Sequence, residues 1–247
     1  MSKVSKLITA GDGFCFNHHW PMWSKILANI LDCDWKNLST YGAGNEAIAN
    51  LVLDQLDTET NLTDSLWVIQ WTSPWRLDLM IIDDSLINLI STDKVYYDNF
   101  ITTSKNKKYW CSSASELDVV KNHNNLISTK QYISRSRIYQ YAVAQALTQR
   151  GVNWKFIFTY EAPWAKHNNI DSSKVVDTSI EAFRQLSQYK DLDVGEIQPV
   201  SSIHLDFLEK YMLSELHVDS QKFKTIKEQI ILDDTKRKYG SQTNRLP

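Results

Sequence analysis

Residues 6–19 read Lys6-Leu-Ile-Thr-Ala-Gly-Asp-Gly-Phe-Cys-Phe-Asn-His-His19 and predict a short buried strand that ends in a tight glycine turn. The turn is Gly11-Asp12-Gly13, and a helical pattern begins near Trp20. A strand, a glycine-rich turn and a helix in succession are typical of α/β domains, whose sites lie at the carboxyl ends of the strands. The first turn is therefore the first place to look for function.

The following residues continue the alternation of strands and helices. Apolar spacing predicts helices at residues 20–31 and 46–56, and strands at residues 35–41 and 65–72. This order favours parallel pairing with right-handed crossovers. We expect a three-layer α/β/α fold with a flavodoxin-like parallel sheet of about five strands.

The pattern is less regular beyond residue 75. Residues 76–125 are interpreted as an insertion or cap at the carboxyl edge of the sheet, with short β-like runs at 79–82, 86–90 and 95–101. A long helix at 130–149, a strand at 154–160, helices at 179–189, 205–213 and 220–232, and a polar tail at 233–247 are expected after it. No repeat or low-complexity linker interrupts the pattern, so a single domain over residues 1–247 is predicted.

Composition excludes several classes of partner. A formal net charge of −2 argues against nucleic acid and anionic membranes. No apolar run approaches the roughly 18 residues that cross a bilayer, and the first residues do not resemble a signal peptide. Cys15, Cys33 and Cys111 are odd in number and unpatterned, which favours free thiols. We expect a protein made in the cytoplasm, without cofactor, nucleic-acid or membrane partners.

Several motifs occur in order along the chain. The first turn reads Gly11-Asp12-Gly13-Phe14-Cys15 and is followed by Trp20-Pro21. Asn37-Leu38 precedes Gly42-Ala43-Gly44-Asn45, and the third strand leads into Gln70-Trp71-Thr72-Ser73-Pro74-Trp75-Arg76. Together these motifs resemble the GDSL/SGNH hydrolase superfamily, in the compact version often encoded by tailed phages.

The resemblance implies a catalytic set that this chain lacks in part. The family has its nucleophilic serine at the position of Gly13 and its orienting aspartate at the position of Ser214. The family histidine corresponds to His217, just before the last predicted helix, and His204 is a second candidate inside a helical segment. Without nucleophile and orienting acid, the mechanism of acyl transfer is incomplete.

The resemblance also implies a set of ligand-binding positions. Gly42 or Gly44, together with Asn45, are the candidates for the oxyanion hole. Thr72 or Ser73 stands where the family has a further asparagine on the third strand.

Other residues offer replacements for the missing nucleophile. Cys15 lies two positions beyond Gly13, and a thiol is a competent nucleophile if its pKa is lowered; the alternative is a small buried cysteine. Asp12 with His217 is a candidate for activating water. Asp12 beside the adjacent His18 and His19 is a poor metal site, because neighbouring histidines diverge, and no His-x-x-x-His or Cys-x-x-Cys spacing occurs. We expect no metal.

The aromatic content is high, with nine tryptophans and eleven tyrosines. Trp71 and Trp75 with Arg76 are suited to a sugar-stacking or protein-contact platform. The alternative is that Trp71 packs in the core, where most such rings lie, and that Arg76 forms a surface ion pair.

These observations favour a non-catalytic structural or binding component, and the resemblance implies a place in a phage virion or tail. One alternative is an active esterase or carbohydrate deacetylase that uses Cys15 or a water activated by Asp12 and His217. Another is a glycan-binding module in the former active-site cleft. The partners expected are virion or tail proteins, further copies of the chain, and a glycan or acyl-ester ligand.

Overall fold

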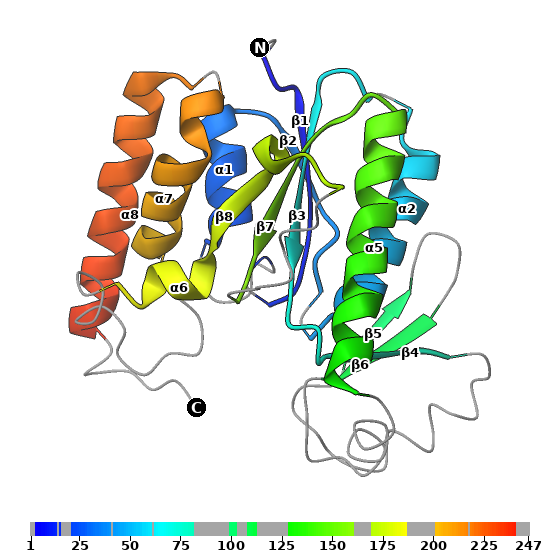
Figure 1. Ribbon diagram of the computed structural model, residues 1–247. Coiled ribbons are helices and arrows are strands. Elements are labelled where there is room, and N and C mark those ends of the chain that lie inside the picture. The colour runs from blue at the N-terminus through cyan, green and yellow to red at the C-terminus, as the bar shows by residue number, and fades with distance from the viewer. Residues whose placement is uncertain are drawn as a thin grey trace.

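The computed structural model describes residues 3–13, 15, 21–40, 42–60, 62–81, 99–102, 108–112, 128–160, 169–186, 201–216 and 218–240. Its centre is a five-stranded sheet in the order β2-β1-β3-β7-β8 (Figure 1). All neighbouring strands pair in parallel, in the 2-1-3-4-5 order of flavodoxin-like folds. The predicted fold class is confirmed. The strands are β1 (Lys6–Ala10), β2 (Asp34–Asn37), β3 (Ser65–Trp71), β7 (Asn153–Phe158) and β8 (Val175–Ser179).

Helices cover both faces of this sheet. Figure 1 shows α2 and α5 on one face and α1, α7 and α8 on the other. None of the helices in the described part of the chain combines the length and apolar character needed to cross a bilayer. The helices are α1 (Trp23–Leu31), α2 (Asn45–Thr58), α5 (Thr129–Gln149), α6 (Ile180–Arg184), α7 (Ser201–Tyr211) and α8 (Ser220–Gly240), with short 3-10 turns at Ser172–Lys174 and Leu213–Glu215.

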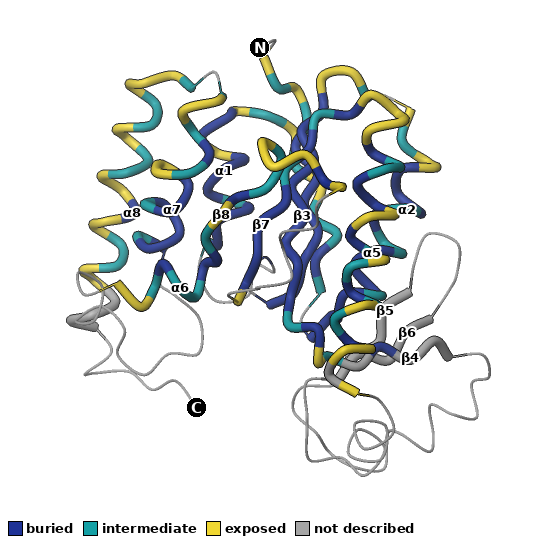
Figure 2. The backbone as a smooth tube through the Cα atoms, in the orientation of Figure 1, coloured by how far each residue is buried: buried dark blue, intermediate teal, exposed yellow. Residues whose placement is uncertain are grey.

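The core has two halves because side chains alternate along each strand. Ile8 and Trp67 pack in the half that contains residues of α2 and α5. Leu7 and Leu66, their neighbours in sequence, pack in the half that contains residues of α1 and α7. Burial on both faces explains why β3 is apolar almost throughout, and Figure 2 shows the central strands as buried.

The predicted insertion contains a second, smaller sheet. Strands β4 (Leu77–Ile81), β5 (Asn99–Thr102) and β6 (Lys108–Ser112) pair antiparallel in the order β4-β6-β5. The predicted run at 79–82 overlaps β4 and the run at 95–101 overlaps β5, whereas 86–90 lies outside the described residues. Because β4 follows β3 closely, this small sheet begins at the carboxyl edge of the large one (Figure 1).

Several elements differ from the expectation. Strand β6 was not predicted, and α7 begins at Ser201, before the predicted start at residue 205. Strand β8 was not predicted, because its sequence Val-Val-Asp-Thr-Ser has no clear alternation and its pairing with β7 is irregular. Helix α8 continues to Gly240, whereas the sequence pattern ended it at Leu232 and placed a polar tail after that residue. Between Leu232 and Tyr239 the helix carries no apolar residue, so periodicity could not detect its continuation.

His204 on α7 is a buried polar group in this apolar setting. Its side chain is fully buried, and neither ring nitrogen has a hydrogen-bond partner in the described part of the chain. Burial lowers the pKa of His204 to about 3, and the positive charge of Arg184 acts in the same direction. Folding therefore holds this imidazole neutral.

We expect the free energy of unfolding of His204→Leu to fall less than that of the wild type as the pH is lowered. Below the ordinary imidazole pKa of 6.5 the unfolded chain binds a proton that the folded chain binds only near pH 3. Wild-type stability is thus fully present above pH 6.5 and is lost as the pH falls towards 3, by at most about 1.4 kcal/mol per pH unit from this group. Urea unfolding between pH 7 and 4 measures the difference. Identical pH profiles for wild type and variant would contradict it.

Candidate functional site

The first turn lies at the point where the order of the strands in the sheet reverses. From β1 the chain proceeds to β2 on one side and then to β3 on the other, so the carboxyl ends of β1 and β3 flank the switch point. Gly11 permits this turn to approach β3, because a Cβ there would lie 2.8 Å from Cβ of Gln70 and 2.9 Å from Cβ of Cys15. The next residue, Asp12, is fully buried at this point.

Both carboxylate oxygens of Asp12 accept several donors. Oδ1 accepts from Nε2 of Gln70 at 2.5 Å and from the Thr159 hydroxyl at 3.4 Å. Oδ2 accepts from the Thr72 hydroxyl at 2.6 Å and faces Nη2 of Arg76 at 3.2 Å. These donors come from the ends of β3 and β7, so one carboxylate joins the carboxyl ends of three strands.

A tryptophan fixes the orientation of the glutamine. Oε1 of Gln70 accepts from Nε1 of Trp23 at 2.5 Å, which directs the amide nitrogen towards Asp12. The same nitrogen donates to Thr159 at 2.7 Å. A buried chain of hydrogen bonds thus runs from helix α1 to the first turn.

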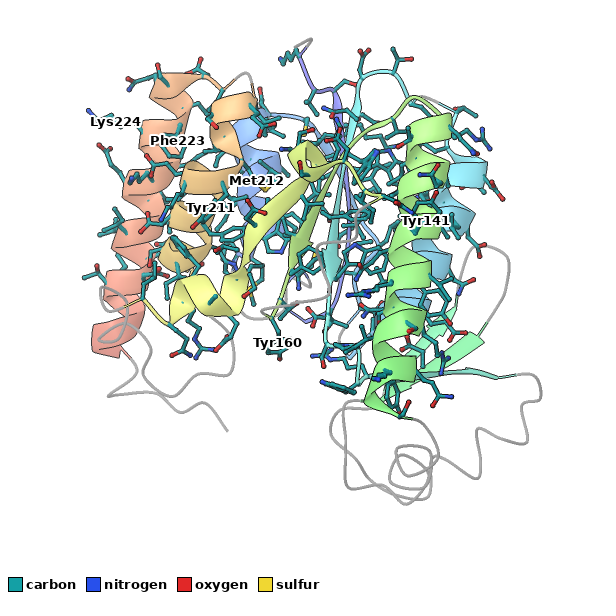
Figure 3. The ribbon with its side chains drawn as sticks, in the orientation of Figure 1. Tyr141, Tyr160, Tyr211, Met212, Phe223 and Lys224 are labelled. Atoms are coloured by element: carbon teal, nitrogen blue, oxygen red, sulfur yellow. The ribbon has the colours of Figure 1, made fainter. Side chains whose placement is uncertain are left out.

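Arg76 continues this network towards the surface. Its Nη1 donates to the carbonyl of Ala43 at 3.4 Å, and its side chain is 16 % exposed. Tyr160, which is 38 % exposed, follows β7 (Figure 3). Burial raises the pKa of Tyr160, while the positive charge of Arg76 opposes the rise. Arg76 therefore forms its ion pair with a buried carboxylate, whereas the alternative drawn from the sequence was a surface ion pair.

Asn45, a candidate for the oxyanion hole, is paired with the end of β3. Its Oδ1 accepts from the backbone N–H of Thr72 at 3.0 Å. Its Nδ2 donates to the carbonyl of Thr72 at 3.1 Å and to the hydroxyl of Ser136 at 3.0 Å. Both amide hydrogens are engaged, so stabilising an oxyanion would require one of these bonds to break. That role stays a prediction.

Gly42 and Gly44 of the second motif have structural roles in the backbone. Gly42 has a φ of 80°, a conformation that favours glycine. Gly44 donates its N–H to Oδ1 of Asp78 at 2.8 Å, and Ala47 donates to Oδ2 at 2.9 Å. Asp78 of β4 therefore caps the N-terminus of α2, where Gly44 has no side chain to do so. Their predicted role in ligand binding is untested.

The first turn provides no exposed nucleophile in its described residues. Gly13 and Cys15 are both buried. Burial raises the pKa of the Cys15 thiol to about 12, and the thiol donates a weak hydrogen bond to Oδ1 of Asn37 at 3.9 Å. The thiol is therefore protonated at neutral pH, as in the alternative of a small buried cysteine.

The tryptophans of the third motif occupy different environments. Trp71 is fully buried and packs edge-on against Phe156, with ring centroids 5.3 Å apart. Its ring is core and is not presented as a surface platform. Trp75 is 45 % exposed and lies edge-on to Tyr132 at 5.5 Å.

His18, His19 and His217 lie outside the described residues, so their roles stay predictions. Glu215, two residues before His217, accepts a hydrogen bond from Nζ of Lys155 at 2.8 Å. Among the described residues, no cluster of three or more histidine, cysteine, aspartate or glutamate side chains is suited to a metal ion.

The described residues before and after the predicted catalytic histidine lie at the amino edge of the sheet. Leu216 lines a small cavity with Leu66 and Asn153, at the starts of β3 and β7. Lys222 at the start of α8 pairs with Asp32, two residues before β2, at 2.5 Å. These neighbours therefore lie opposite to the first turn.

Gln70, Thr159, Asp78 and Tyr160 were not predicted as site residues. Thr159 and Tyr160 had a usable signal, because they are polar residues at the end of a predicted strand. Gln70 belongs to the third motif, but its contacts and those of Asp78 were not predictable, since their partners lie at least 47 and 31 residues away along the chain.

Comparisons with known proteins add one finding. No family model matches the sequence, and no curated protein matches it. A similar solved structure is that of a member of the lipolytic protein G-D-S-L family from Veillonella parvula, at 10 % identity and a TM-score of 0.37, covering 92 % of this chain and 97 % of that chain. A likeness at this level carries no argument about function.

We expect Asp12→Asn to lower the free energy of unfolding by about 3 kcal/mol, because removing one partner of a buried ion pair leaves Arg76 uncompensated. Asp57→Asn is the matched control, since Asp57 pairs with Arg150 at the surface and should cost less than about 0.5 kcal/mol. Urea denaturation measures both. Equal losses for the two variants would refute a special role of the buried carboxylate.

We expect Gly44→Ala to cost about 2 kcal/mol, because its methyl group would lie 2.5 Å from Oδ2 of Asp78 and displace the cap of α2. In an Asp78→Ala background the same change should cost much less. A double-mutant cycle from urea unfolding tests this coupling. Additive losses would show that Asp78 is not what restricts position 44.

Proposed function

We propose that the protein is a non-catalytic binding protein that holds its ligand at the carboxyl edge of the sheet, over Asp12, Thr72 and Arg76. The observation that carries this proposal is the first turn, where the hydrolases that the motifs resemble have a serine. Gly13 occupies that position and has no side chain to attack a substrate.

The neighbouring groups support the same conclusion. A general base must direct a free lone pair at the proton that it removes. Each oxygen of Asp12 already faces two donors, from Gln70 and Thr159 or from Thr72 and Arg76. These bonds favour a structural role for the Asp12 carboxylate over a role as the base that activates water.

Cys15 is equally unsuited to covalent chemistry. A thiol with a pKa of about 12 has a negligible thiolate fraction at neutral pH, and the side chain is fully buried. The displaced-nucleophile alternative would need a rearrangement of the turn to expose this sulfur.

We further propose that the protein is a component of a phage virion or tail. The support for this role is the sequence resemblance to the compact, phage-encoded version of the GDSL/SGNH superfamily. Partners would then be virion or tail proteins and further copies of the chain. Co-sedimentation of the chain with assembled particles would support this role, and its recovery only in the unassembled fraction would count against it.

We expect purified wild type to hydrolyse p-nitrophenyl acetate and acetylated sugars no faster than its Cys15→Ala, Asp12→Asn and His217→Ala variants. The physical reason is that neither Gly13 nor the buried thiol provides a nucleophile. Initial rates at pH 7 to 9 for the four proteins, purified in parallel, measure this. Turnover by the wild type that disappears in any one variant would establish an enzyme and overturn the proposal.

A further inference from the structure

The exposed end of the Asp12 network is the guanidinium of Arg76. Asp12 is fully buried, and three neutral donors share its charge with Arg76: Gln70, Thr72 and Thr159. The positive end of the ion pair is therefore the end nearer to solvent. The bonds to Asp12 and to the carbonyl of Ala43 hold the guanidinium in place. A guanidinium held in this way needs little ordering before it binds a ligand.

Two partly exposed aromatic residues, Tyr160 and Trp75, lie in the same part of the carboxyl edge as this guanidinium. Strands β3 and β7 are in register at Trp71 and Phe158, so the residues that follow them emerge side by side. Tyr160 follows β7 and is near enough to Arg76 for the guanidinium charge to act on its hydroxyl. Trp75 lies against Tyr132, which lines a small cavity together with Arg76. A cation and two partly exposed aromatic residues thus share the carboxyl edge.

We propose that this edge binds a sugar that bears a carboxylate, with Arg76 and Tyr160 contacting the carboxylate and Trp75 contacting the sugar ring. The inference rests on the proposed binding function and names its ligand class. The planar fork of a guanidinium matches the two oxygens of a carboxylate, and a tyrosine hydroxyl adds a further donor. An exposed tryptophan offers a rigid apolar face with little conformational entropy to lose.

Glu46 and Asp78 also line the cavity beside Arg76, but Glu46 pairs with Arg135 and Asp78 accepts two backbone N–H groups. The charge of Arg76 therefore favours an acidic sugar over a neutral one. A ligand from solvent meets the cation of the pair, because the carboxylate of Asp12 lies beneath it in the protein. A carboxylated ligand gains charge-assisted hydrogen bonds there, whereas a neutral sugar of the same shape gains only ordinary ones.

Isothermal titration calorimetry with glucuronic acid and glucose tests the proposal on the full chain. We expect saturable binding of glucuronic acid that is about tenfold tighter than that of glucose and weakens with added salt. Arg76→Gln should lower the affinity for glucuronic acid at least about tenfold, and Tyr160→Phe about threefold. Arg150→Gln, the same change at the remote surface pair with Asp57, should leave the affinity unchanged.

Stability is checked for each variant, since Arg76→Gln removes a partner of a buried carboxylate. If that variant unfolds, Tyr160→Phe and Arg76→Lys carry the test: the first removes one hydroxyl, and the second keeps the charge but loses the planar fork. Equal affinity for glucose and glucuronic acid, or wild-type affinity in Tyr160→Phe and Arg76→Lys, would overturn the proposal.

Two further measurements distinguish a failure of this inference from a failure of the binding function on which it rests. Binding of inorganic phosphate but not glucuronic acid would overturn the sugar assignment and leave an anion-binding edge. Ester turnover by the wild type would overturn the non-catalytic function, while dependence of glucuronic acid affinity on Arg76 would still support this ligand class.

Discussion

A buried carboxylate organises the carboxyl edge of this protein. Moving an ionised group such as Asp12 out of water is costly unless hydrogen bonds replace its hydration. Gln70, Thr72, Thr159 and Arg76 provide these bonds, and they come from the ends of neighbouring strands and from the loop after β3. The need to satisfy one charge thus gathers β1, β3 and β7 at a common point.

A second carboxylate attaches the smaller sheet to the same edge. Asp78 of β4 accepts from the backbone of Gly44 and Ala47 at the start of α2, and Asn45 of that helix pairs with the backbone of Thr72. Polar groups in the motifs that resemble a hydrolase are therefore used in holding strands and helices together. This structural use gives the motifs a role that does not depend on a nucleophile at the first turn.

The candidate site was predictable in part. Asp12, Thr72 and Arg76 belong to motifs that follow β1 and β3, and parallel strands with adjacent carboxyl ends bring such motifs together. The contrast between Trp71 and Trp75 was not predictable, because both belong to one short motif and only the end of β3 separates a core ring from an exposed one. Tyr160 was part of a predicted strand, but its contact with Arg76 depends on the register of β7 against β3.

The sequence by itself determined the fold class, since alternating strand and helix periodicities with glycine punctuation specify a parallel α/β sheet. It also located the candidate turn, which carries glycine where the hydrolases that the motifs resemble have a serine. Only the tertiary structure decided what the polar side chains do. Asp12 meets Gln70 and Thr159 across 58 and 147 residues of chain. Such pairings depend on strand register and on the close approach of buried groups, which local patterns of polarity do not encode.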